Sequence, residues 1–201
     1  MCGMRFQRGH LLARLFHSVA VVALGAVCFA SAANADPFEK SKQFPAIDEF
    51  RFGILATNLE GGGSNEGDYA INGELLFGRF RPNYADPVRQ FLLNPRPHIG
   101  FSINPSGGTS QAYTGLTWDF KLTSKLFVEG SFGGAIHDGP TGDNNSDSYG
   151  CSLLFRESAS VGIDLTDKLR VMATVDHISN AGLCPENQGL TNAGVRLGYR
   201  W

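Results

Sequence analysis

The chain has 201 residues, of which 25 are glycine, 42% are hydrophobic and 18% are charged, and its formal net charge is −2. This length suits one domain or two small ones. The charge excludes a nucleic-acid binder, because neutralising phosphates needs an excess of Lys and Arg. The mean hydropathy is −0.11, and no apolar run reaches the roughly 18 residues of a spanning helix. A helical membrane protein is therefore excluded, whereas a β-barrel is not.

Residues 1–35 have the pattern of a cleaved signal peptide. Arg5, Arg8 and Arg14 precede an apolar stretch at 19–30, and no acidic residue occurs before Asp36. The Ala-Asn-Ala sequence at 33–35 fits a cleavage site with small flanking residues. The apolar stretch is too short to span a membrane. We therefore expect an exported protein whose mature domain comprises residues 36–201.

Eight segments of about ten residues alternate apolar and polar side chains between turn-rich stretches, which is the pattern of half-buried strands. An even number of strands is what a closed bacterial barrel needs. The sequence thus predicts an all-β fold, an eight-stranded antiparallel transmembrane β-barrel. A short helix at 88–93 is predicted as well, because Asp86-Pro87 supplies an N-cap and a first helical residue. The predicted strands cover 48–58, 69–78, 97–104, 111–122, 126–137, 151–165, 168–179 and 191–201.

The polar face of these strands decides what the apolar face contacts. It carries more charges than a dry core of a soluble protein accommodates, but a small barrel can pair such charges inside itself. The apolar face is therefore expected to contact lipid. The charges that we assign to the interior are Glu74, Asp119, Lys121, Glu129, Arg156, Arg170, Arg196 and Arg200.

The last strand ends the chain on Trp201, with apolar side chains at every second position from Ala193. This C-terminus resembles the assembly signal of bacterial outer-membrane barrels. If both termini face the periplasm, the tight turns at 123–125 and 165–167 are periplasmic and the long loops at 138–150 and 180–190 are outside. Cys151 and Cys184 then both lie at the outer rim, where they could form a disulfide or remain two free thiols.

The seventh strand departs from the apolar pattern at its outer end. Its lipid face carries Leu169, Val171 and Val175 and then continues to His177 and Ser179. Same-face neighbours on a strand are close enough for an imidazole and a hydroxyl to form a hydrogen bond. Polar groups that face hydrocarbon are costly, which suggests a function. The alternative is that the pair lies above the membrane in water, and spacing alone does not separate the two.

The sequence His-Ile-Ser-Asn-Ala-Gly at 177–182, followed by Pro185, Asn187 and Gly189 and by Leu-Gly-Tyr-Arg-Trp at 197–201, resembles the lipid A 3-O-deacylase family of outer-membrane proteins (PagL-like, related to acyloxyacyl hydrolases). Segments 132–137 and 154–158 are similar to that family as well. The resemblance implies an eight-stranded outer-membrane barrel that hydrolyses the ester-linked acyl chain at the 3 position of lipid A. Its partners would be lipopolysaccharide and outer-membrane lipid, its active site would face the outer leaflet, and no metal or organic cofactor is implied. The oligomeric state stays open, a homodimer included.

By similarity, Ser179 is the nucleophile and His177 is the general base that activates it. Asn187 matches the side chain of the family's oxyanion hole, and the Gly182 N–H is expected to assist it.

Thr191 departs from the family pattern, which has a glutamate at the matching position. A threonine hydroxyl can accept a hydrogen bond from imidazole but carries no charge. Glu186 in the preceding loop is an alternative third member. Three interpretations stay open: a slower enzyme with a Ser–His dyad, a triad completed by Glu186, or a catalytically inactive barrel with a structural or adhesion role.

Overall fold

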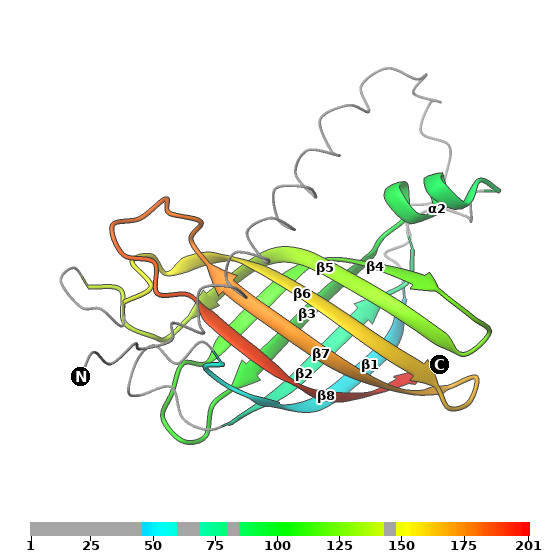
Figure 1. Ribbon diagram of the computed structural model, residues 1–201, viewed down its shortest axis with the longest axis horizontal. Coiled ribbons are helices and arrows are strands. Elements are labelled where there is room, and N and C mark those ends of the chain that lie inside the picture. The colour runs from blue at the N-terminus through cyan, green and yellow to red at the C-terminus, as the bar shows by residue number, and fades with distance from the viewer. Residues whose placement is uncertain (1–45, 60–68, 80–84, 143–147) are drawn as a thin grey trace, which may run out of the picture. The chain divides into compact units, whose positions relative to one another are not determined.

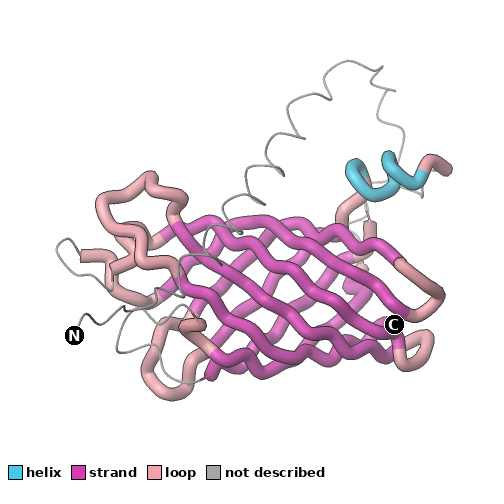
Figure 2. The backbone as a smooth tube through the Cα atoms, viewed as in Figure 1, coloured by secondary structure: helices cyan, strands magenta, loops and turns pink. Residues whose placement is uncertain are grey.

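A computed structural model describes residues 46–59, 69–79, 85–142 and 148–201. The predicted leader, residues 1–35, lies outside them. Eight antiparallel strands pair in chain order, and β8 closes on β1 to complete a barrel (Figures 1 and 2). The strands are β1 (Ile47–Ala56), β2 (Tyr69–Phe77), β3 (Arg96–Ile103), β4 (Gln111–Lys121), β5 (Leu126–His137), β6 (Leu153–Asp164), β7 (Leu169–Ser179) and β8 (Leu190–Arg200).

The predicted all-β fold of eight antiparallel strands is confirmed, and every strand end lies within two residues of its predicted position. The predicted helix is also present as α2 (Pro87–Leu93). Asp86 is its N-cap and accepts a hydrogen bond from the Arg89 N–H at 2.8 Å, which satisfies a donor that the first turn of a helix leaves without a partner. Among the described residues, no helix is both long and apolar enough to cross a membrane.

The barrel is apolar outside and charged inside. On β1, Phe52 and Ile54 are half-exposed, while Arg51 between them is fully buried. The Arg51 guanidinium contacts three carboxylates in the interior: Glu49 at 2.7 Å, Glu74 at 3.0 Å and Glu129 at 2.6 Å. This alternation explains how a chain of near-zero mean hydropathy presents an apolar surface to lipid.

The interior changes character toward the end where β7 leads into β8. A cluster of buried apolar side chains fills the barrel there. Next to it, Arg156 stacks its guanidinium over the Tyr113 ring at 3.7 Å and pairs with Asp176 at 2.8 Å. The filled interior gives β7 a rigid inner face from which its outward side chains project. The cluster comprises Tyr113, Ala135, Tyr149, Leu154, Ile178 and Leu190.

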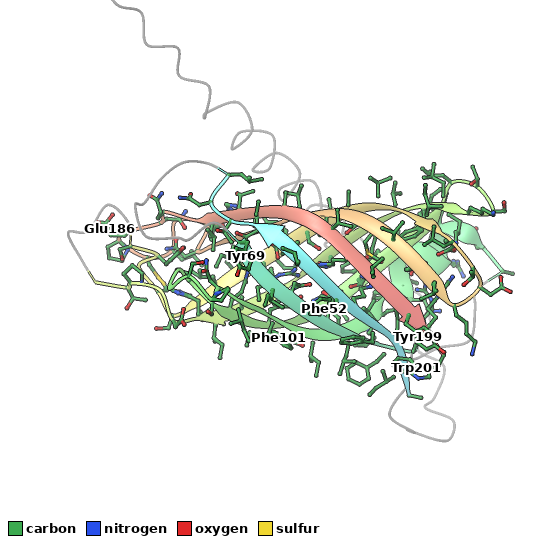
Figure 3. The ribbon with its side chains drawn as sticks, turned by 90° about the horizontal axis from the view of Figure 1, so that it is seen from below. Phe52, Tyr69, Phe101, Glu186, Tyr199 and Trp201 are labelled. Carbon is green, nitrogen blue, oxygen red and sulfur yellow. A yellow bond between two sulfur atoms is a disulfide. The ribbon has the colours of Figure 1, made fainter. Side chains whose placement is uncertain are left out.

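The two ends of the barrel differ in their connections. Thr123 and Thr166 each accept a hydrogen bond at 2.9 Å from the backbone N–H three residues on, which closes the tight turns of β4–β5 and β6–β7. These turns and the C-terminus lie at one end, and the long β7–β8 loop lies at the other (Figure 1). Trp201 and Glu186 accordingly occupy opposite ends (Figure 3). The outer end of β7 is therefore next to the long loops.

Candidate active site

His177 lies on the outward face of β7, between two other strands. In the strand register it is directly opposite Thr191 of β8 and directly opposite Glu157 of β6. Its Nδ1 is 2.7 Å from the Thr191 Oγ1. Both side chains of this pair are nearly buried, with exposed fractions of 8% and 5%. A hydrogen bond thus fixes the orientation of the imidazole ring from the β8 side.

Ser179 is the next residue on the same face of β7. Alternate Cα atoms on a strand are about 7 Å apart, a spacing that an imidazole can bridge toward a hydroxyl. Ser179 is 9% exposed and is directly opposite Phe155 of β6. The Phe155 ring stacks on Phe132 of β5, with 6.0 Å between ring centroids. The hydroxyl therefore adjoins an aromatic surface on the outside of the barrel.

The polar outward side chains of β5 to β8 are gathered at one place. Every residue of these strands is described, and their other outward positions carry aliphatic or aromatic side chains or glycine. Because the register aligns them across three strands, they form a single polar cluster on an otherwise apolar wall. We call it the outer polar cluster. Its members are Glu157, His177, Ser179 and Thr191.

Asn180 organises the loop that follows β7. Its side chain is buried, with 2% exposed. The amide Nδ2 donates to the carbonyls of Tyr149 at 2.8 Å and of Glu186 at 2.5 Å. Its Oδ1 accepts from the Gly182 N–H at 2.8 Å, and its own N–H donates to the Asn187 Oδ1 at 2.8 Å. One buried side chain thus holds the loop against the neighbouring one.

These contacts place the remaining predicted site residues. The sequence predicts that the Gly182 N–H assists an oxyanion; in the structure that N–H is already donated to Asn180. Asn187 is held next to the end of β7 because its Oδ1 accepts a hydrogen bond from the Asn180 N–H. The Nδ2 group of the same amide takes no part in that bond. Glu186 enters the network through its backbone, because its carbonyl oxygen accepts from the Asn180 Nδ2 at 2.5 Å. The same carbonyl packs so closely on Gly150 that an added Cβ there would lie 2.1 Å from it.

Cys151 and Cys184 are joined in a disulfide, with 6.1 Å between their Cα atoms. Cys184 belongs to the β7–β8 loop, and Cys151 lies just before β6. The bond therefore ties the loop that carries Asn187 to the preceding loop, in addition to the contacts of Asn180.

Loss of this disulfide is expected to loosen the β7–β8 loop without opening the barrel. Closing a loop of about 30 residues is worth roughly 3–4 kcal/mol in chain entropy, and here that restraint acts on the two outer loops. We expect the Cys151→Ser, Cys184→Ser double variant to be cleaved at 181–189 at least tenfold faster in limited proteolysis. The same acceleration should follow when the wild-type protein is reduced. Equal cleavage rates with and without reduction would contradict the prediction.

Sequence reasoning did not predict the position of Glu157 opposite His177 or the contacts that Asn180 makes with two loops. Glu157 could have been found, because Asp167 at the tight β6–β7 turn lies midway between Glu157 and His177 in the sequence. Folding an antiparallel pair about that turn sets the two residues opposite each other. No comparable signal existed for Asn180, whose partners come from two separate loops.

A closed eight-stranded barrel with an apolar wall and a charge-filled interior is the architecture of small outer-membrane barrels. Imidazole and hydroxyl side chains on that wall, next to long loops, define a barrel with a candidate hydrolase site. The sequence model for the lipid A 3-O-deacylase (PagL) family matches residues 99–200. The chain belongs to this family, and the matched range contains all four members of the outer polar cluster.

A solved structure with a TM-score above 0.5 agrees with this fold, and two further matches have lower scores. A crystal structure of the outer-membrane enzyme PagL superposes with a TM-score of 0.56 at 19% identity, covering 76% of this chain and 99% of that one. A de novo designed transmembrane β-barrel gives a TM-score of 0.48 at 12% identity, with coverage of 82% and 100%. The Yersinia pestis outer-membrane protein Ail gives 0.43 at 11% identity, with coverage of 77% and 99%. No curated protein sequence matches the chain.

Proposed function

We propose that the chain is an outer-membrane esterase that removes the acyl chain ester-linked at the 3 position of lipid A, with the site facing the outer leaflet. The observation that carries the proposal is the arrangement of His177, whose Nδ1 is bonded to Thr191 while Ser179 follows it on the lipid-facing wall. Lipid A presents its acyl esters in the outer leaflet, so a nucleophile on the outside of the barrel meets the substrate without extracting it from the membrane.

The scheme assigns His177 the tautomer in which Nδ1–H donates to the Thr191 hydroxyl, an orientation that their 2.7 Å contact allows. With Nδ1–H donating to the Thr191 hydroxyl, Nε2 keeps its lone pair and serves as the general base. It takes the proton from the Ser179 Oγ as that oxygen attacks the ester carbonyl. The ester C–O bond then breaks, and His177 returns the proton to the sugar hydroxyl that leaves. Water hydrolyses the acyl-enzyme by the same proton transfers in reverse.

The Asn187 amide supplies the oxyanion donor in this proposal. Its Oδ1 accepts from the Asn180 N–H, which leaves the Nδ2 group to donate to the oxygen of the tetrahedral intermediate. One such donor is worth roughly 3–4 kcal/mol of transition-state stabilisation. The Gly182 N–H is the second donor of this proposal, and it would have to exchange its bond to the Asn180 Oδ1 for the oxyanion. No residue in this scheme calls for a metal or an organic cofactor.

The acyl chain has an apolar surface beside the nucleophile. Phe155 lies directly opposite Ser179 and stacks on Phe132, and both rings are on the outer wall. An acyl chain that extends from the ester carbonyl over β5 and β6 would contact these rings and remain in the hydrocarbon of the membrane.

The test is the mass of lipid A before and after incubation with the purified, refolded barrel. The expected result is loss of one ester-linked acyl chain and its recovery as a free fatty acid, with fragmentation assigning the 3 position. Loss of an acyl chain from another position would change the assigned specificity. An unchanged mass with correctly folded protein would overturn the proposal.

The second candidate is a catalytically inactive barrel with a structural or adhesion role. Thr191 favours it, because a hydroxyl at this position orients the imidazole but does not stabilise its charged form. Under this alternative the wild-type protein and a Ser179 variant behave identically on lipid A.

A homodimer in the membrane is compatible with either candidate and is checked by cross-linking in vesicles.

Gly189 is expected to be needed for the position of the His177 ring. Its φ is +68°, and an added Cβ would lie 3.0 Å from the ring Cε1 and 3.4 Å from Nε2. We expect Gly189→Ala to lower the rate of deacylation by about 10- to 100-fold, because small misplacements of a catalytic group cost that much. The measurement is the initial rate of fatty acid release.

Gly107→Ala is the matched control. Gly107 also has a positive φ, +87°, but an added Cβ there has nothing within 4 Å. Both variants carry the backbone strain of a left-handed residue, and only one of them approaches the imidazole. Equal rates for the two variants would contradict the prediction, because the contact with the His177 ring would then have no effect of its own.

A further inference from the structure

We propose that Glu157 supplies the negative charge that stabilises His177 when the imidazole is protonated, acting from β6 on the side opposite Thr191. The inference rests on the proposed Ser179–His177 chemistry and extends it. The family's glutamate at the position of Thr191 would orient the imidazole and also stabilise its positive charge. Here these two tasks fall to two residues on two strands. Thr191 orients the ring through its contact with Nδ1, and Glu157 provides the charge.

The strand register brings the carboxylate within reach of the imidazole. Glu157 is directly opposite His177 in the β6–β7 pair, and opposed residues in an antiparallel pair have Cβ atoms about 4.5–5.5 Å apart. On its other side Glu157 is opposite Phe132 of β5, so its surroundings there are apolar. A charge at this distance, in a site with little water, acts on the imidazolium more strongly than it would in bulk water.

The location of Glu157 on the lipid-facing wall needs an explanation in itself. The neighbouring outward positions of β6, Phe155 and Ala159, are apolar and exposed. An acidic side chain on the lipid face of a barrel is destabilising, by an amount that depends on depth. Ionisable groups in such places mark functional sites. A position beside His177 gives the carboxylate a cationic partner whenever the imidazole takes up a proton.

Two other acidic residues lie near the end of β7, and neither lies opposite His177 in the strand register. Asp176 points into the barrel, where it pairs with Arg156 at 2.8 Å and lies 3.9 Å from Arg196. Glu186 contributes its carbonyl oxygen to Asn180. The strand register and the close approach of the loop set Thr191 of β8, Glu157 of β6 and Gly189 against His177, and Ser179 follows it on its own strand.

The proton balance of the reaction is unchanged by this assignment. The proton passes from the Ser179 Oγ to the His177 Nε2 and then to the leaving hydroxyl. Glu157 stays ionised throughout and accepts no proton. It acts through His177 and touches no reacting atom, so it is a positioning residue. Its contribution is greatest when the imidazolium and the oxyanion are both present, which predicts an effect on kcat with little effect on KM.

The experiment uses the full-length refolded barrel and two readouts. The first is hydrolysis of lipid A. The second is the rate at which an alkyl fluorophosphonate labels Ser179, a step in which the Oγ–P bond forms, fluoride leaves and the proton goes to His177. We expect Glu157→Gln to lower both rates by about 10- to 100-fold. This is less than the roughly 10⁴-fold loss when the neutralised acid also sets the tautomer. Glu157→Asp should be intermediate.

Asp167→Asn is the control for charge removal. Asp167 is exposed in the β6–β7 turn, at the far end of the same hairpin, and its variant should keep both rates within twofold of wild type. A second acid provides the rescue. Thr191→Glu in the Glu157→Gln background places a carboxylate on the other side of the ring, where Thr191 now contacts Nδ1. Restoration of at least tenfold in kcat is expected, and Thr191→Glu in the wild-type background should raise kcat by a smaller factor. Equal factors in the two backgrounds would indicate a merely structural role of Glu157 and would contradict the inference.

The outcomes separate this inference from the proposed function. Full rates in Glu157→Gln by both readouts would overturn the inference, and loss in Glu186→Gln instead would assign the charge to the loop. If wild type leaves lipid A unchanged but labels at a rate that depends on Glu157, the proposed substrate is wrong and the inference stands. If folded wild type neither hydrolyses lipid A nor reacts with the fluorophosphonate, both are overturned.

Discussion

Ser179→Ala is expected to abolish release of the acyl chain from lipid A while leaving the barrel intact. The variant removes the Oγ that attacks the ester, and no other hydroxyl lies on the outward face of β7, whose residues are all described. Removing the nucleophile of a Ser–His enzyme costs on the order of 10⁶-fold in kcat. The measured rate should therefore fall to background, by mass spectrometry of lipid A and by fluorophosphonate labelling.

Folding is checked by measuring the unfolding of the same Ser179→Ala preparations. Ser179 is nearly buried but lies at the end of β7, and loss of its oxygen should change the free energy of unfolding by no more than about 1 kcal/mol. Ser152→Ala, at an exposed position of the outer rim, should retain full activity. Deacylation by folded Ser179→Ala at the wild-type rate would remove Ser179 from the mechanism.

Arg51→Met is expected to destabilise the barrel more than any other single change considered above, by about 3–5 kcal/mol. Arg51 is fully buried and contacts Glu49, Glu74 and Glu129, the last with two hydrogen bonds of 2.6 Å. Removing the cation takes away the bidentate partner of Glu129, whereas Glu49 still pairs with Arg96 at 2.8 Å and Glu74 lies 3.6 Å from Arg196. Urea titration in detergent micelles, followed by the fluorescence of the two tryptophans, measures the change.

Two further variants test whether the loss of stability in Arg51→Met comes from uncompensated charge inside the barrel. Glu129→Gln in the Arg51→Met background removes one uncompensated charge and should recover part of the lost stability, because the two residues are directly bonded. Lys125→Met removes a cation from an exposed turn and should change stability by no more than about 0.5 kcal/mol. A loss in Arg51→Met as small as that in Lys125→Met would show that water inside the barrel screens the network.

Local pattern was sufficient for the barrel. Alternation along ten-residue segments identified all eight strands, since a strand with one face on lipid and one on a charged interior repeats every second residue. The tight turn around Asp167 also fixes which residues of β6 and β7 face each other, because a short hairpin leaves one register. The position of Glu157 opposite His177 can thus be predicted from the sequence, but only by combining the alternation with the place of the turn.

The site was only partly accessible in this way. His177 and Ser179 follow from their place on the apolar face, and Thr191 follows from the family resemblance. The loop between β7 and β8 is long, however, and a long loop allows many registers. Only the folded chain brings the Thr191 hydroxyl to 2.7 Å from the imidazole. The same holds for Asn180, whose donors reach carbonyls of two loops.

By itself, then, the sequence determined the class of fold, the direction in which each strand side chain points and the identity of the imidazole–hydroxyl pair. These properties depend on period and local turns, which are short-range. The pairing of Arg51 with carboxylates from three strands and the position of Thr191 beside His177 were set by the tertiary structure. They depend on which strands lie side by side, and only the closed barrel sets that arrangement.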